Sequence, residues 1–88
     1  MSDLYTVIVL RPARKDIERL HPKIRGQIYR TLQRLEANPR PHDVKSLRGA
    51  PGYRVDSGEY RILYEVDDRE RSVVVRVIKH RKDVYRNL

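Results

Sequence analysis

The sequence contains no cysteine, no tryptophan and no phenylalanine. The absence of cysteine excludes disulfide bonds and thiolate metal sites, and it is typical of a protein that works in a reducing cytoplasm. The three histidines, His21, His42 and His80, are scattered and lack the spacing of metal ligands. The chain also has no phosphate-binding glycine loop and no nucleophile elbow. We therefore expect neither a metal nor another cofactor.

The chain also lacks a long hydrophobic segment. Its most apolar run, Leu4–Leu10, is too short to span a bilayer, and it lacks the basic flank and the small-residue cleavage site of a signal peptide. We therefore expect a cytoplasmic protein with no membrane contact. The 88 residues are enough for a single small domain, residues 1–88, which would bury about 60–65% of the surface of its unfolded chain.

Positive charge is the most pronounced feature that the sequence does have. Twenty lysines and arginines stand against twelve acidic residues, giving a formal net charge of +8, and fifteen of the twenty cations are arginines. One interpretation is a solvated surface that keeps a small protein soluble. The other is a polyanionic partner, and the excess of arginine favours nucleic acid because the guanidinium group matches phosphate with a planar fork of donors.

The N-terminal half predicts one strand and two helices. Leu4–Leu10 is rich in β-branched residues and nearly continuous in apolar character, which indicates a strand covered on both faces. A first helix is expected near Pro12, because proline is well tolerated at the first helical position. His21 interrupts its apolar periodicity, and a second amphipathic helix is expected over Pro22–Ala37. These two helices would form a hairpin.

The C-terminal half predicts a loop, three strands and a tail. The loop covers Arg40–Gly52, the strands are expected at Tyr53–Asp56, Tyr60–Val66 and Ser72–Ile78, and His80–Leu88 is expected to leave the last strand as a short helical or irregular tail. The fold class is therefore α+β, with a two-helix hairpin packed on one face of a small, mainly antiparallel four-stranded sheet in which the last strand lies beside the first.

Strand alternation predicts that charged side chains collect on the face that the helices leave uncovered. Two interpretations of that face remain open: cross-strand ion pairs on a solvated surface, each contributing about 0.2–1 kcal/mol, or a phosphate-binding site. The strands supply Arg54, Asp56, Arg61 and Glu65, and the end of the chain supplies His80, Arg81 and Tyr85.

Two segments resemble the RelE/ParE superfamily of bacterial and archaeal toxins: LRGAPGYRVDSGEYRILYEV at Leu47–Val66 and VIKHRKDVY at Val77–Tyr85. The resemblance extends over nearly the whole chain and is strongest to the RelE branch. It implies a RelE-like fold and the toxin of a type II toxin–antitoxin system, a metal-independent endoribonuclease that cuts mRNA on the ribosome and inhibits translation. It also implies a cognate acidic antitoxin, similar to RelB, as the partner.

There are four catalytic candidates: the resemblance places Arg61, Arg81 and Tyr85, and the chemistry of imidazole adds His80. Arg61 and Arg81 match family arginines, and both would bind the phosphate and stabilise transition-state charge, because an arginine does not release its proton at neutral pH. Tyr85 matches a family tyrosine that would act as the base or stack on a nucleobase, although it can also pack the tail onto the sheet. His80 would be the acid, or else a strand-end residue that faces the helices.

Four further cations are candidates for binding RNA phosphates: Arg48, Arg54, Lys79 and Lys82. Arg54 stands in place of a family lysine, and Lys79 stands where many relatives have glycine. Asp56 occupies the position of a second family lysine, which changes the proton-transfer chemistry of the site. Asp56 would serve either as a base or as the ion-pair partner of Arg54.

Two other functions are compatible with the same sequence. A ParE-like toxin would poison DNA gyrase through protein contacts and would not be a nuclease, and the fold alone does not separate it from an endoribonuclease. A plain basic nucleic-acid-binding module would show strongly salt-dependent affinity without harming the cell.

Overall fold

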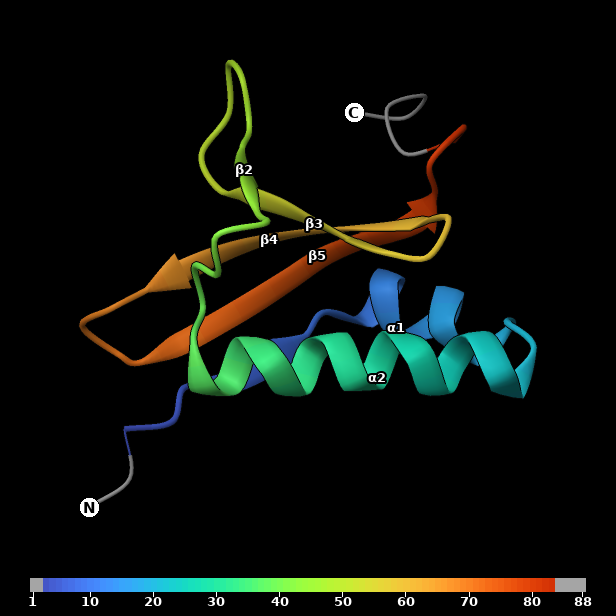
Figure 1. Ribbon diagram of the computed structural model, residues 1–88, viewed down its shortest axis with the longest axis horizontal. Helices are drawn as coiled ribbons and strands as arrows, with labels where there is room; N and C mark the ends of the chain where they lie inside the picture. Colours follow the sequence, from blue (N-terminus) through green and yellow to red (C-terminus); the bar gives the residue numbers. More distant parts are fainter. Residues whose placement is uncertain (1–2, 84–88) are drawn as a thin grey trace.

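A computed structural model describes residues 3–83, which form a five-stranded sheet with two helices on one side. The strand order is β1-β5-β4-β3-β2. Figure 1 shows both helices below the sheet, and β2 with the loop that follows it above β3. In chain order the elements are β1 (Thr6–Val9), α1 (Arg11–Glu18), α2 (Pro22–Ala37), β2 (Lys45–Ser46), β3 (Tyr53–Ser57), β4 (Tyr60–Asp67) and β5 (Ser72–His80).

The two helices form where the sequence predicts them. Each has a proline in its first turn, where the missing N–H costs no helical hydrogen bond. His21 caps α2, because its Nδ1 accepts a hydrogen bond of 3.2 Å from the backbone N–H of Lys23. Within residues 3–83, neither helix has the length and hydrophobicity that a membrane span requires. The helices bury one apolar stripe each, consisting of Ala13 and Ile17 in α1 and of Ile28, Leu32 and Leu35 in α2.

The sheet combines one parallel and three antiparallel strand pairs. β5 pairs in parallel with β1 and antiparallel with β4, so the last strand does lie beside the first, as predicted. β3 and β4 are joined by the two-residue turn Gly58-Glu59, with Ser57 opposite Tyr60. Gly58 has a φ of +59°, which short hairpin loops require and which glycine adopts without steric cost. The α+β class is confirmed.

Alternation along the strands separates a buried face from an open face. Ile62 and Tyr64 of β4 are fully buried against the helices, whereas Arg61 and Glu65 are only partly buried on the other side. The Tyr64 hydroxyl donates a hydrogen bond of 2.7 Å to the Pro39 carbonyl, and burial raises the pKa of Tyr64 to about 12. The helices cover a single face of the sheet, as the sequence predicts.

The predicted strand count is wrong by one. The segment Arg40–Gly52, expected to be a loop, contains the edge strand β2, in which Lys45 lies opposite Arg54 and Ser46 lies opposite Tyr53. A strand of two residues is too short to show an alternating pattern, so the sequence carries no signal for it. The sheet therefore has five strands rather than four.

The prediction that the first strand is covered on both faces is also wrong. β1 is an edge strand, and its residues alternate between exposed and partly buried. Ile8 is 44% exposed, because no layer covers the open face at this edge. The continuous apolar run indicates only that the strand pairs with another apolar strand, the valine-rich β5.

A loop folds back over the open face and covers part of it. Leu63 points to the open face but is only 4% exposed. Together with Leu47, Ala50 and Pro51 it lines an apolar groove of about 350 Å³. Gly52 allows the loop to approach this closely, because a Cβ atom there would lie 2.5 Å from the Tyr64 carbonyl oxygen.

A polar network joins four segments that are distant in the sequence. Arg40 donates hydrogen bonds of 2.9 Å to both carboxylate oxygens of Asp68 and one of 2.8 Å to the Tyr53 hydroxyl. The Tyr5 hydroxyl donates a hydrogen bond of 2.6 Å to Asp68 Oδ1. The hydrogen bonds from Arg40, followed by the one from Tyr5, lower the pKa of Asp68 to about 2.

We expect this network to give an acid-dependent contribution to stability. Because the folded-state pKa of Asp68 lies below its ordinary value of 3.8, the contribution is complete above about pH 4 and is lost as the pH falls toward 2. Urea unfolding of Asp68→Asn should therefore show a lower midpoint than the natural protein at pH 7 and an equal midpoint at pH 2. Glu70→Gln, in the same turn, is the matched control and should leave the urea midpoint unchanged at both pH 7 and pH 2.

Substitution of two loop glycines should separate backbone strain from steric overlap. Gly49 has a φ of +71° with nothing within 4 Å of the position of a Cβ atom, so Gly49→Ala should cost only the left-handed backbone strain, about 1–2 kcal/mol. Gly52→Ala adds the overlap with Tyr64 and should cost about 1–3 kcal/mol more. Equal unfolding free energies for the two variants would show that the loop does not press on β4.

Candidate active site

A small polar pocket lies on the open face of the sheet. Asp43, Lys45, Arg54, Asp56 and Arg61 line it, and its volume is about 140 Å³. The strand register creates the pocket, because it places Lys45 opposite Arg54 and Asp56 opposite Arg61. Three adjacent strands and the segment before β2 thus bring three cations and two carboxylates together.

Arg61 is held in this pocket with part of its hydrogen-bonding capacity unused. Its side chain is 24% exposed, and its Nε lies 3.3 Å from Asp56 Oδ1. This Nε is buried but makes no hydrogen bond within the described part of the chain. A buried donor without an acceptor is unfavourable, so an anion that enters the pocket can supply the acceptor that residues 3–83 do not.

Two ion pairs involve the carboxylates of the pocket. Asp56 pairs with Arg61 across the β3–β4 hairpin, and the pairing of Asp56 with Arg54 that the sequence suggested stays a prediction. Asp43 pairs with Arg34 of α2 at 2.8 Å, and this hydrogen bond lowers the pKa of Asp43. Lys45 was not singled out in the sequence, because its position opposite Arg54 depends on the short strand β2.

His80 is engaged by its neighbours on the helix-covered side of the sheet. Its Nε2 lies 3.1 Å from Glu59 Oε2, and its Nδ1 accepts a hydrogen bond of 3.2 Å from the Lys82 backbone N–H. The ring stands edge-on to Tyr60 at a centroid distance of 5.5 Å. His80 does not line the pocket, and its role as the acid stays a prediction.

Arg81 lies at the same end of the sheet as Arg61 but contacts a different carboxylate. Its backbone N–H donates to the Glu59 carbonyl, and its guanidinium lies 3.7 Å from Glu59 Oε1. The hydrogen bond from His80 and the charge of Arg81 lower the pKa of Glu59. Arg81 is not among the residues that line the pocket, so its convergence with Arg61 on one phosphate stays a prediction. Tyr85 lies outside the described residues.

Of the four predicted phosphate-binding cations, only Arg54 lines the pocket. Arg48 is exposed in the loop after β2, and Lys82 is exposed in the turn after β5. Lys79 lies opposite Arg61 in the sheet, but its ammonium group pairs with Asp16 of α1 at 3.1 Å. The pocket is therefore built mainly by β2, β3 and β4.

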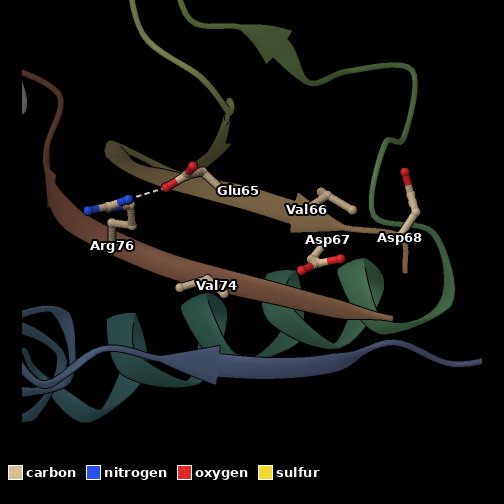
Figure 2. Close-up of a pocket in the computed structure, with 6 residues that line it drawn as sticks. All are labelled: Glu65, Val66, Asp67, Asp68, Val74 and Arg76. Atoms are coloured by element: carbon tan, nitrogen blue, oxygen red, sulfur yellow. Dashed lines mark hydrogen bonds and ion pairs between the residues drawn. The ribbon is translucent and has the colours of Figure 1, made fainter. Parts of the chain in front are cut away.

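The other end of the open face is acidic. A second depression of about 450 Å³ lies there, lined by Glu65, Val66, Asp67, Asp68, Val74 and Arg76 (Figure 2). Figure 2 shows Glu65 and Arg76 turned toward each other as an ion pair across β4 and β5. Glu65 thus belongs to this depression and not to the arginine pocket. Among residues 3–83, no group of three or more histidine, aspartate or glutamate side chains can hold a metal ion.

Comparison with known proteins identifies the class of protein that this fold and pocket define. Residues 7–84 match the model of a family described as the ParE toxin of the type II toxin–antitoxin system parDE. Because this match spans most of the chain, the protein belongs to this family of type II toxins.

Individual relatives indicate the RelE-like part of the family. Toxin RelG of Mycobacterium tuberculosis is 31% identical over 86 residues, which cover 93% of this chain and 97% of the relative. A chain in the crystal structure of the RelBE2 toxin–antitoxin complex from the same organism is 31% identical, with a TM-score of 0.78 and coverage of 88% of this chain and 98% of that chain. A chain of the archaeal RelE–RelB complex from Pyrococcus horikoshii is 25% identical, also with a TM-score of 0.78. The match covers 89% of this chain and 96% of that chain. The protein is a RelE-like toxin.

Proposed function

We propose that this toxin is a metal-independent endoribonuclease that acts in the cytoplasm and cuts mRNA on the ribosome. The observation that carries the proposal is the pocket on the open face, where Arg54 and Arg61 lie together and the buried Nε of Arg61 has no acceptor among residues 3–83. The similarity to relatives named RelE and RelG supports the same activity. Inhibition of translation follows from the loss of the message.

RNA cleavage without a metal requires a base, an acid and positive charge. The 2′-oxygen attacks the adjacent phosphorus, so a base must accept the 2′-hydroxyl proton and an acid must protonate the departing 5′-oxygen. Arg54 and Arg61 suit the third requirement, because positioned guanidinium groups stabilise the additional charge on the phosphate oxygens. Arg81, which is 57% exposed at the same end of the sheet, would join them from the tail.

We further propose that an acidic antitoxin similar to RelB neutralises the toxin. Relatives of this fold were crystallised as toxin–antitoxin complexes. The net charge of +8 favours a partner of opposite sign. A partly disordered acidic segment that orders on binding can cover the open face and displace the tail.

A ParE-like inhibitor of DNA gyrase is the second candidate, because the matching family model is described as ParE. Primer extension on cellular mRNA during toxin expression separates the two functions. Codon-phased cuts in translated messages indicate the endoribonuclease, whereas damaged DNA with intact mRNA indicates the gyrase inhibitor. A plain nucleic-acid-binding module would produce neither result and would leave growth normal.

Removal of the arginines should abolish toxicity without unfolding the protein. Both Arg61→Ala and Arg81→Ala should relieve growth arrest and lower the rate of mRNA cleavage by about 10²–10³-fold, the usual effect of removing one group that stabilises transition-state charge. Circular dichroism should show that both variants remain folded. Full toxicity of the double variant would exclude this pair from the site.

Tight association with an acidic partner can be tested by co-purification. The tagged toxin, expressed together with the adjacent reading frame of its own genome, should retain that protein through a salt wash, since a coupled-folding interface buries apolar area in addition to forming ion pairs. A toxin that is harmless when expressed alone, and that elutes without a partner, would contradict the proposal.

A further inference from the structure

The five residues that line the arginine pocket differ in their ability to transfer a proton. A guanidinium group does not serve as an ordinary acid or base, which excludes Arg54 and Arg61. Asp43 is already bound to Arg34 at 2.8 Å, and this hydrogen bond holds the pKa of Asp43 below its ordinary value. The residues that remain are one amine, Lys45, and one carboxylate, Asp56.

Lys45 is an exposed ammonium group beside the phosphate-binding arginines. It lies on β2 directly opposite Arg54, and it forms no ion pair with any carboxylate among residues 3–83. In this respect it differs from Lys79, whose ammonium group is bound to Asp16. A lysine ammonium carries three protons and, unlike a guanidinium, can release one to a strong base such as a departing alkoxide.

Asp56 is the carboxylate of the pocket that lies next to both arginines. It lies two residues beyond Arg54 on β3, opposite Arg61, and its side chain is 62% exposed. Its Oδ1 lies 3.3 Å from Arg61 Nε, and the two atoms do not form a hydrogen bond. The carboxylate therefore retains lone pairs for a hydroxyl group of a bound ligand.

We propose that Lys45 and Asp56 are the proton-transfer pair of this toxin, with Lys45 as the general acid and Asp56 as the general base. The proposal rests on the endoribonuclease function proposed above. Asp56 accepts the proton of the 2′-hydroxyl while the 2′-oxygen forms a bond to phosphorus. The bond from phosphorus to the 5′-oxygen breaks, and Lys45 donates its proton to that oxygen. The products are a 2′,3′-cyclic phosphate and a free 5′-hydroxyl.

A substrate whose leaving group needs no proton tests the role of Lys45. The full-length toxin is added to ribosomes that carry a short mRNA, with either oxygen or sulfur as the bridging 5′-atom at the cut. Lys45→Ala should cleave the oxygen substrate about 10²–10⁴-fold more slowly than the natural protein, the usual effect of losing a general acid. It should cleave the sulfur substrate within a few-fold of the natural rate.

Two control variants separate proton donation from binding and from folding. Arg61→Ala should be slow on both substrates, because charge stabilisation is needed whichever atom departs. Lys23→Gln removes the same charge from an exposed position on α2 and should cleave both substrates normally. Equal losses on the two substrates for Lys45→Ala, or no loss on either, would overturn the role of Lys45. If the natural protein cleaves neither substrate, the endoribonuclease function itself is wrong.

The pH dependence of the cleavage rate tests Asp56. With the carboxylate removed in Asp56→Asn, hydroxide must take the 2′-proton, so the single-turnover rate should rise about tenfold per pH unit between pH 6 and 8. The natural protein should show a smaller dependence over that range. Parallel pH profiles for the two proteins would show that Asp56 acts only as the ion-pair partner of Arg61.

Discussion

The register of the β3–β4 hairpin is the constraint on which the site depends. The turn Gly58-Glu59 fixes Ser57 opposite Tyr60, and the pairing of Asp56 with Arg61 follows from it. A slip of one residue would turn the apolar side chains of these strands to solvent and the charged ones into the core. The burial of Ile62 and Tyr64 under the helices therefore holds the arginine pocket in place.

The sequence predicts those parts of the structure that a repeating pattern encodes. The apolar spacing predicts both helices, and alternation predicts which side of β4 carries Arg61, because each pattern extends over several residues. The short strand β2 has no such repeat, and Lys45 was missed for the same reason. The burial of Leu63 and the pairing of Lys79 with Asp16 depend on contacts between distant segments, which local patterns do not record.

The charge of the molecule is distributed unevenly between its two layers. In and beside the sheet, carboxylates pair with Arg61, Arg76 and Arg81. The pocket itself has two carboxylates against three cations, so its excess charge is small. Among the lysines and arginines of the two helices, only Arg34 has an ion pair in the part of the chain that the structure describes. Long-range attraction to polyanions therefore comes mainly from the helical layer, whereas the sheet supplies short-range, directional contacts.

The parallel pairing of β1 with β5 has a consequence for the synthesis of the protein. β1 precedes both helices along the chain, but its partner, residues 72–75, follows all the other strands of the sheet. The core side chains Val73 and Val75 are missing from any shorter nascent chain. The sheet therefore cannot close until β5 has been made. The β1–β5 pair thus forms only after both helices and the strands β2, β3 and β4 have been synthesised.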